Sequence, residues 1–413
     1  MNKKLAFFGG EKIRTKKMPA RRAMGELERK KFSEVLPYYD KLGEDPPYDG
    51  FFQKEFERKF SDNMSGGFSK AVSTGSIACY VGVKSLNLPA SSEVIFSPVS
   101  CSGSLFAITE ANLKPVIVDS MPDSFNTSWK YIKQAINRKT SALFLSHIGG
   151  IPLDMEEIVY ECNKLGLPVI EDCSQAPFAR VLTNKKSNID GVSENCYVGT
   201  YGAISVFSTM YRKNLQTGGS GGVVFTKNRD IYNQIIMQTD RGRPKWRDGY
   251  TGRDPGDCEF SAQNFNTDEF SSAIGIASLE RIQETISKRL SFMDIFSEKI
   301  KDLNNHITNA SYPRGTSPFL LPMILNEKYI GEKEKIAAMI SSEGIDLSPR
   351  YDCVVCQWSI VKKLKIRVID NFNVNKMKSQ SFNLFLNENY TEEEANDIHL
   401  AMKKVFNFLS KNK

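Results

Sequence analysis

The sequence has no long apolar run, few histidines and one closely spaced pair of cysteines, and each shortage excludes a class of function. No segment reaches the roughly 18 apolar residues that a membrane-spanning helix needs. The opening residues MNKKLAFFGGEK contain too short an apolar core for a secretory signal. We therefore expect a cytoplasmic protein with no membrane partner.

Residues that bind metals are equally sparse. The three histidines, His147, His306 and His399, lie far apart and form no triad or metal-binding pattern. Cys353 and Cys356 have the spacing of zinc ligands, but no second cysteine pair or nearby histidine completes a four-ligand site. We predict no metal site, and without a secretion signal the eight cysteines indicate reduced thiols.

The composition is that of a globular protein of about two to three domains. The 413 residues include 40% hydrophobic and 25% charged residues, which is enough for a large core. The formal net charge of +7 comes from 55 basic and 48 acidic residues spread along the chain. This mild excess suits an anionic small molecule and does not indicate a nucleic-acid partner.

Strand-like and helix-like segments alternate in the middle of the chain. The runs EVIFS, PVIVD, ALFLS and LPVIED are largely apolar, and amphipathic segments such as MEEIVYECNKLG lie between them. This alternation predicts a parallel sheet with helices on both faces. Before it, Phe51, Phe52, Phe56 and Phe60 share one face of a helix predicted over residues 51–63.

Loops and a long helix are predicted further along. Residues 179–203 and 240–257 are polar and contain glycine, so both are predicted to be loops. Arginines in the second loop indicate either a solvated basic loop or a phosphate or subunit contact. Residues 268–302 have the pattern of a long helix leading to a second domain, and a last helix is predicted from Thr391. A shorter helix is expected within residues 123–137.

The residues that could carry chemistry follow the predicted strands. The stretch SVFSTMYRKNLQTGGSGG presents Ser208 at a strand end and Lys213 five residues later, before a glycine-rich turn and the strand VVF. A lysine held there could be a Schiff-base nucleophile, because a desolvated amine can stay neutral and reactive. The alternative is an ordinary lysine on a surface loop.

Two further stretches have a similar placement. Thr74-Gly75-Ser76 lies between a strand and an apolar helix, where free backbone amides form an anion site, although the stretch could be only a helix cap. Asp172 ends the strand LPVIED, and ligands collect at such carboxyl ends. Its carboxylate could hold a protonated ring nitrogen, or it could cap a helix.

A phosphate site, a carboxylate after one strand and a lysine after a later strand, in that order, fit pyridoxal phosphate (PLP). The flanking motifs resemble those of the DegT/DnrJ/EryC1/StrS aminotransferases, the sugar and cyclitol branch of the fold-type-I PLP enzymes. The motifs are AVSTGSIACYVGVKSLNL, VIEDCSQA, FSTMYRKN with TGGSGGVVF, and NFNTDEFSSAIGIASLERI. The resemblance extends from about residue 5 to about residue 290 and weakens beyond.

This resemblance implies the fold. We expect an α/β architecture with an aspartate-aminotransferase-like large domain, containing a mostly parallel seven-stranded sheet, and a smaller α+β C-terminal domain. The chain would divide into an N-terminal arm and helix at residues 1–50, a large PLP-binding domain at 51–285 and a small domain at 286–413.

The resemblance also implies residue roles. Lys213 would form the Schiff base with PLP and shuttle a proton between the substrate and cofactor carbons. Asp172 would pair with the pyridine nitrogen. The other cofactor contacts would be Gln175 at the ring hydroxyl, Gly75, Ser76 and Ser208 at the phosphate, and Asn264 at the phosphate of the neighbouring subunit's cofactor. The last contact implies an obligate homodimer with shared active sites.

The implied reaction transfers an amino group from glutamate or glutamine to a keto-sugar, often nucleotide-linked, or a keto-cyclitol, in polysaccharide or secondary-metabolite biosynthesis. Two alternatives are a sugar dehydratase that uses pyridoxamine phosphate (PMP), against which Lys213 argues, and a non-catalytic PLP-binding regulator. Three positions depart from the family pattern. Cys101 replaces a ring-stacking aromatic residue, Asn266 replaces a basic residue, and Gly219-Ser220 replaces a frequent glutamate.

Overall fold

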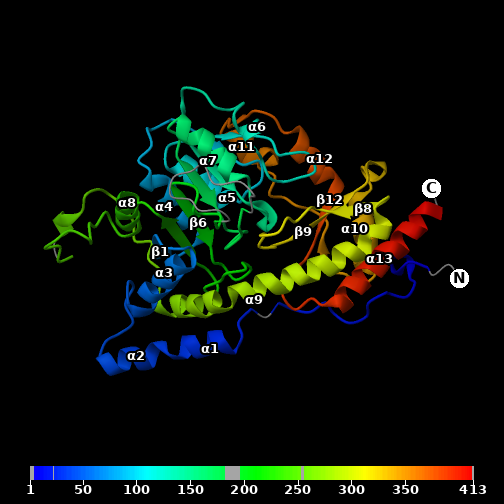
Figure 1. The fold of residues 1–413 in the computed structure, drawn as a ribbon, viewed down its shortest axis with the longest axis horizontal. Coiled ribbons are helices and arrows are strands. Elements are labelled where there is room, and N and C mark those ends of the chain that lie inside the picture. Colours follow the sequence, from blue (N-terminus) through cyan, green and yellow to red (C-terminus); the bar gives the residue numbers. More distant parts are fainter. Residues whose placement is uncertain (1–3, 22, 182–195, 253–254, 412–413) are drawn as a thin grey trace.

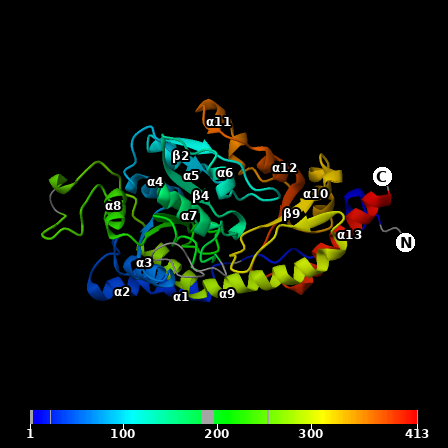
Figure 2. The same cartoon turned by 45° about the horizontal axis from the view of Figure 1, so that its top comes forward.

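The computed structural model describes residues 4–21, 23–181, 196–252 and 255–411 and shows two β-sheets joined by a long helix (Figure 1). Helix α9 (Glu269–Lys299) runs along one side of both sheets in two views (Figures 1 and 2). Among these residues, no helix combines the length and the apolar character that a membrane span requires.

The larger sheet has the strand order β1-β7-β6-β5-β4-β2-β3-β11. Strand β7 is antiparallel to both of its neighbours and the other pairs are parallel, which confirms the mostly parallel sheet. The seven expected strands are all present, and β11 is an eighth. The strands are β1 (Phe68–Val72), β2 (Glu93–Phe96), β3 (Lys114–Ile117), β4 (Thr140–Ser146), β5 (Val169–Asp172), β6 (Ile204–Ser208), β7 (Gly222–Thr226) and β11 (Arg367–Val368).

Strand β11 joins the edge of the large sheet from the C-terminal part of the chain. Val368 pairs with Ile117 of β3, and the amide of Ile369 donates to the carbonyl of Ile117 (2.9 Å). Arg367 forms an ion pair with Glu93 of β2 (2.6 Å). Two residues are too few to give a strand pattern in the sequence, which is why seven strands were expected instead of eight.

Helices cover both faces of the large sheet, as the apolar strands predict. Side chains alternate between the faces, so Val206 of β6 packs in a cluster with α4, α5 and α8, whereas Phe207 packs with α3 and α9. Helices α6 and α7 extend the second layer. The helices of this region are α1 (Glu26–Ser33), α2 (Val35–Leu42), α3 (Phe51–Asn63), α4 (Gly75–Ser85), α5 (Ser102–Glu110), α6 (Trp129–Ile132), α7 (Met155–Lys164) and α8 (Arg229–Thr239).

Helix α3 has the predicted bounds, but its apolar face is narrower than predicted. Phe52, Phe56 and Phe60 are buried, whereas Phe51 is 47% exposed. Phe51 is the first residue of the helix and stacks on Tyr38, with the ring centroids 4.6 Å apart. Its ring therefore covers a neighbouring helix and does not enter the core.

The predicted loops and the shorter helix agree in part with the structure. The helix within residues 123–137 is reduced to the four residues of α6, because turns fill the segment before it. Residues 182–195 of the loop predicted at 179–203 lie outside the described residues. In the loop at 240–257, the described part contains only the short 3-10 helix η3 (Pro255–Asp257).

The basic side chains of that second loop form ion pairs within the chain. Asp240 accepts contacts from Arg241 (2.9 Å) and Lys245 (2.9 Å), and Arg247 pairs with Glu259. These pairs neutralise cations that a phosphate would need. They favour the solvated basic loop over phosphate capture.

The smaller sheet is antiparallel, with the order β10-β12-β9-β8. Leu5 of the arm and Phe292 and Phe296 of α9 belong to its core. Helix α9 crosses residue 285 without a break, and the three-part domain division stays a prediction. The elements are β8 (Ile307–Asn309), β9 (Leu321–Leu325), α10 (Lys333–Ser342), β10 (Leu347–Ser348), α11 (Ser359–Lys363), α12 (Phe372–Gln380), β12 (Ser381–Leu384) and α13 (Glu392–Lys411).

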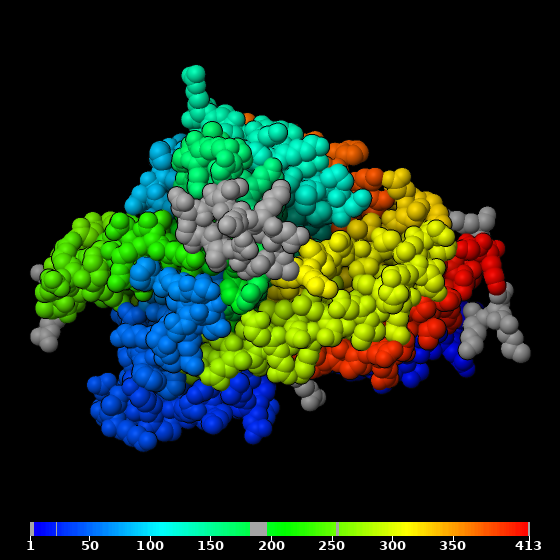
Figure 3. Space-filling view, in the orientation of Figure 1, coloured from blue at the N-terminus to red at the C-terminus, as the bar shows by residue number. Residues whose placement is uncertain are grey.

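The N-terminal arm is bound to the C-terminal helix. Arg14 is buried and forms ion pairs with Glu394 (2.9 Å) and Asp397 (2.6 Å), both on α13. In the space-filling view, the N-terminal residues (blue), α9 (yellow-green) and α13 (red) form one continuous flank (Figure 3). The two ends of the chain therefore stabilise each other.

Replacing Phe60 by alanine should destabilise the protein far more than the same change at Phe51. Phe60 is 0% exposed and contacts the rings of Phe178, Phe207 and Phe225, so Phe60→Ala should cost about 3–5 kcal/mol. Phe51→Ala, on the same helix, should cost about 1 kcal/mol or less. Equilibrium urea unfolding measures both changes, and equal losses would contradict the packing described for α3.

Candidate active site

The carboxyl ends of β4, β5 and β6 meet at one edge of the large sheet and place Asp172 at its centre. Asp172 is 6% exposed. Its Oδ2 accepts hydrogen bonds from the hydroxyls of Ser104 (3.1 Å) and Ser146 (3.4 Å), and its Oδ1 accepts one from the amide of Ser174 (3.0 Å). No helix begins in residues 173–181, so the carboxylate is not a helix cap.

Lys213 lies in the connection between the antiparallel strands β6 and β7. Its amide donates to the carbonyl of Met210 (2.9 Å), and its Nζ lies 4.6 Å from the ring centroid of Phe319. Burial lowers the pKa of Lys213, and the negative charge of Asp172 opposes this shift. The Lys213 residue is half-buried, and the lowered pKa indicates that its amine is less hydrated than that of an exposed loop lysine.

The start of α4 packs tightly against the end of β6. Thr74 caps α4 by accepting a hydrogen bond from the amide of Ile77 (3.0 Å). A Cβ atom added to Gly75 would lie 2.5 Å from the Cβ of Ser208, and one added to Gly103 would lie 2.1 Å from the Oγ of Ser76. The helix start and two hydroxyls thus form a cradle that only glycine backbone permits, and helix starts favour bound anions.

Gln175 joins this edge of the sheet to the C-terminal segment that contains Tyr351. Its Oε1 accepts from the amide of Gly149 (2.8 Å), and its Nε2 donates to the hydroxyl of Tyr351 (3.4 Å). Both contacts fix the orientation of the carboxamide. The predicted contact with a ring hydroxyl stays a prediction.

Asn264 is the predicted site residue that lies apart from this group. It is exposed, its Oδ1 accepts from the side chain of Asn266 (2.8 Å), and it lines a hollow of about 390 Å³ with Ser73 and Ser220. The next residue, Phe265, accepts a hydrogen bond from the amide of Ser73 (3.0 Å). Asn264 therefore lies beyond the end of β1, at the surface of the chain.

Cys101, which stands where the family pattern has an aromatic residue, precedes helix α5. Its thiol is exposed and lies 3.3 Å from the hydroxyl of Ser104, one of the donors to Asp172. The amide of Ser100 donates to the carbonyl of Cys353 (3.1 Å), so the C-terminal segment closes this side of the site. A thiol offers less face contact to a planar ring than an aromatic side chain does.

Glu171 points to the other side of β5, as strand alternation predicts, and its contacts are structural. It accepts hydrogen bonds from the amides of Gly199 (2.8 Å), Tyr201 (3.0 Å) and Gly202 (2.6 Å). His147 Nδ1 accepts from the amide of Leu153, so its Nε2 carries the proton and donates to Glu171 (3.2 Å). The ligand atoms of His147, Glu171 and Cys173 approach one another within 4.8 Å, but the first two are already hydrogen-bonded.

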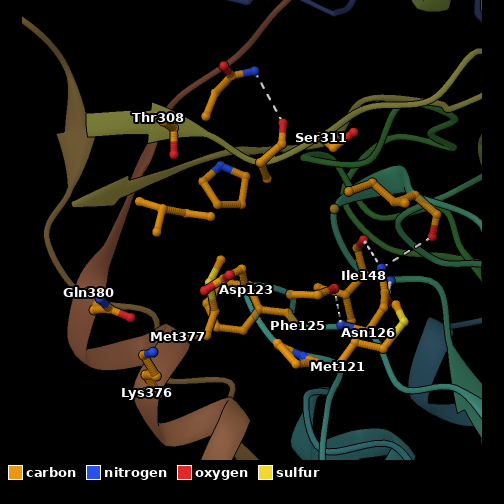
Figure 4. Close-up of a pocket in the computed structure, with 18 of the residues that line it drawn as sticks. Met121, Asp123, Phe125, Asn126, Ile148, Thr308, Ser311, Lys376, Met377 and Gln380 are labelled. Carbon is orange, nitrogen blue, oxygen red and sulfur yellow. Dashed lines mark hydrogen bonds between the residues drawn. The ribbon is translucent and has the colours of Figure 1, made fainter. Parts of the chain in front are cut away.

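A cavity of about 640 Å³ adjoins the site between the large sheet and the small one (Figure 4). Phe125, Asn126 and Ile148 line its side toward the large sheet, and Asn126 exchanges hydrogen bonds with the backbone of Ile148 (2.8 and 3.1 Å). Gly149, the next residue, donates to Gln175. One short backbone segment thus separates the cavity from Gln175.

Sequence reasoning missed the residues that reach the site from distant segments. Ser104, Ser146, Phe319 and Tyr351 contact Asp172, Lys213 or Gln175, but none belongs to a motif. Ser146 ends a predicted strand, and this position at a strand end was the only feature of the sequence that could have marked it as a site residue. The other three could not be identified without the fold.

The fold and this lysine–carboxylate edge define an α/β protein of the aminotransferase class. The model of the DegT/DnrJ/EryC1/StrS aminotransferase family matches residues 44–403, and the chain belongs to this family. The family, fold and enzyme class expected from the sequence are therefore confirmed. The individual roles of the site residues stay predictions.

Named relatives act on sugars or cyclitols. A GDP-perosamine synthase of Escherichia coli O157:H7 is 31% identical over 260 residues, which cover 62% of this chain and 64% of that protein. The match thus spans less than two thirds of that relative. A putative L-glutamine:3-amino-2,3-dideoxy-scyllo-inosose aminotransferase of Micromonospora echinospora is 22% identical over 350 residues, 84% of this chain and 79% of that protein.

Solved structures share the fold over nearly the whole chain. An aminotransferase from Psychrobacter cryohalolentis has a TM-score of 0.82 at 22% identity and covers 94% of this chain and 99% of its own. The E. coli GDP-4-keto-6-deoxy-D-mannose-3-dehydratase, solved with hydrated PLP, has a TM-score of 0.79 at 19% identity and covers 92% and 97%. These likenesses establish the fold.

Replacing Gly75 by alanine should weaken binding of PLP by about tenfold or more, because the new Cβ would force Ser208 away from the cradle. Absorbance titration of cofactor-free protein with PLP measures the affinity. Gly219→Ala is the matched control, since nothing lies within 4 Å of a Cβ there, in the turn that follows Lys213. Unchanged affinity in Gly75→Ala would contradict the cradle.

Proposed function

We propose that the chain is a cytoplasmic PLP-dependent aminotransferase that moves an amino group from glutamate or glutamine to a keto-sugar or keto-cyclitol. The observation that carries this proposal is the poorly hydrated Lys213 amine at the same sheet edge as the buried Asp172. All eight cysteines are free, which agrees with a reducing compartment.

The residues present fit PLP. Gly75, Ser76 and Ser208 would hold its phosphate at the start of α4, where a side chain on Gly75 would fill the space. Asp172, which accepts hydrogen bonds from Ser104 and Ser174, would hold the ring nitrogen in its protonated form. Gln175 would contact the ring hydroxyl. When bound, PLP supplies an electron sink for the negative charge that develops on the amino-bearing carbon.

Lys213 would perform the proton transfers. Its Nζ would accept a proton from the substrate carbon and then donate that proton to the second carbon, whose protonation completes the half-reaction. Because burial lowers the pKa of Lys213, the neutral amine is available at lower pH than in an exposed lysine. The ring of Phe319, 4.6 Å from Nζ, would limit the water that reaches the transferred proton.

The names of the relatives support a hydroxylated acceptor. One is a GDP-perosamine synthase and another a putative aminotransferase acting on an aminoinosose. The positive net charge of +7 is compatible with a nucleotide-linked, anionic substrate. The cavity beside Gln175 has the volume of a small-molecule site and lies where an acceptor could extend from the reacting centre.

Two alternatives make different predictions at the same site. A PMP-dependent dehydratase of this fold would remove a sugar hydroxyl. The chain resembles the E. coli dehydratase in fold, which is why this alternative is considered. The presence of Lys213 argues against it. A non-catalytic PLP-binding regulator is favoured only by Cys101. Glutamate binding without release of 2-oxoglutarate would indicate the regulator.

Replacing Lys213 by alanine should reduce amino transfer on the order of a thousandfold or more, since no other amine would move the proton. A coupled assay for 2-oxoglutarate, with glutamate as donor, measures the rate. Lys227→Ala, an exposed lysine after β7, should retain wild-type rates. A Lys213→Ala protein that still worked at a normal rate would disprove the assignment.

The active sites are proposed to be shared within a homodimer, because Asn264 lies at the surface, where a partner's cofactor could meet it. Lys213→Ala and Asn264→Ala chains, each impaired alone, should complement when co-expressed in equal amounts. Random pairing would restore about a quarter of wild-type activity, because half of the dimers would contain one intact site of two. Absence of recovery in mixed dimers verified by tags would exclude shared sites.

A further inference from the structure

A buried arginine on α9 holds the segment that bears Lys213. Arg289 is 1% exposed, and its Nη1 donates to the Oδ1 of Asn214 (2.6 Å) and to the carbonyl of Pro318 (3.0 Å). Asn214 directly follows Lys213, and Phe319, whose ring covers the Lys213 amine, directly follows Pro318. The Arg289 guanidinium therefore contacts the residue next to Lys213 and the residue next to Phe319.

The side chain of Asn214 closes this arrangement. Its Nδ2 donates to the hydroxyl of Ser317 (3.1 Å) and to the carbonyl of Pro318 (3.2 Å). Arg289 thus binds the oxygen of the same carboxamide whose nitrogen binds the segment before Phe319. The lysine loop and this segment are joined both directly and through Arg289.

Glu388 and Arg21 anchor the guanidinium from the opposite side. Arg289 donates to the Oε2 of Glu388 through Nε (3.2 Å) and Nη2 (2.8 Å), and Arg21 donates to its Oε1 (3.3 Å). Arg21 also donates to the carbonyls of Tyr211 (3.3 Å) and Asn214 (3.4 Å). The N-terminal arm, α9 and the segment after β12 therefore converge on the lysine loop.

Arginine has a geometry here that lysine cannot reproduce. The guanidinium uses three nitrogens in one plane to bind Glu388 on one side and Asn214 and Pro318 on the other. Burial lowers the pKa of Arg289 to about 10, against the opposing charge of Glu388. An ammonium group would reach only part of this set.

We propose that Arg289 is a positioning residue for Lys213, which holds the amine against Phe319 and away from bulk water by binding Asn214 and Pro318. Its importance for catalysis depends on the proposed function, but its effect on Lys213 does not. The titratable groups that face Lys213 are Asp172 on β5, Cys79 on α4, Cys101 before α5 and Cys353 in the C-terminal segment.

The test compares Arg289→Lys with wild type in cofactor-free protein. Acetic anhydride modifies neutral amines, so the extent of acetylation of Lys213, read by peptide mass spectrometry against pH, gives its titration midpoint. In wild type the midpoint should lie below that of the exposed Lys363, because Lys213 is desolvated. In Arg289→Lys it should rise by about one pH unit, because a looser loop lets water reach the amine.

Arg281→Lys provides the matched control. Arg281 lies on the same helix and also binds the arm, but its hydrogen bonds go to Glu28, Ala23 and Thr285 and not to the lysine loop. Its Nη1 lies 3.8 Å from Glu388, and a lysine at this position keeps the positive charge that this ion pair uses. Its replacement should leave the midpoint of Lys213 unchanged. Asn214→Ser is a second variant that removes the shared carboxamide without removing a charge, and it should raise the midpoint in the same direction as Arg289→Lys.

The loaded enzyme gives an independent readout. With PLP and both substrates, Arg289→Lys should lower kcat about tenfold and change KM for glutamate by less than about twofold, because a misplaced amine affects the chemical step. If wild type transfers no amino group but the midpoint still shifts, the proposed function fails and the role of Arg289 stands. An unchanged midpoint in folded Arg289→Lys and Asn214→Ser, or an equal shift in Arg281→Lys, overturns that role.

Discussion

The structure depends on keeping the amine of Lys213 and the carboxylate of Asp172 at one poorly hydrated sheet edge. Burial penalises both charges, so each needs support. Asp172 receives it from two serine hydroxyls and one backbone amide. Lys213 has the ring of Phe319 and the opposing charge of Asp172 near its amine, and burial lowers the pKa of that amine.

This placement requires the ends of three elements to come unusually close. A Cβ on Gly75 would collide with Ser208, and one on Gly222 would lie 2.5 Å from the carbonyl of Thr74. Strands β6 and β7 and helix α4 can therefore meet only because both positions lack side chains. The same close approach of α4 to β6 and β7 brings the hydroxyl of Ser208 to the start of α4.

Local patterns predicted which residues follow the strand ends, but they left other interpretations open for Lys213 and Asp172 until the family resemblance was added. Asp172, Ser208 and Lys213 follow apolar runs, so the sheet direction alone brings them to one edge. Phe319 and Arg289 contact the lysine segment from more than 70 residues away, and no period or motif records such contacts. The same limit explains β11, whose two residues are a strand only because β3 offers an open edge.

Glu171 and Asp172 are adjacent on β5, and their side chains point to opposite faces of the sheet, one with structural contacts and one toward the site. Glu171 faces away from the site and binds three backbone amides in residues 199–202, just before β6 begins. Those contacts fix where β6 starts and hence where Ser208 and Lys213 lie at its far end. Asp172 faces the other side and stays available to a ligand. If the two carboxylates changed sides, residues 199–202 would lose the contacts of Glu171 and the site would lose the carboxylate of Asp172. The position of β6 and the chemistry at the ends of β5 and β6 therefore depend on the same strand alternation.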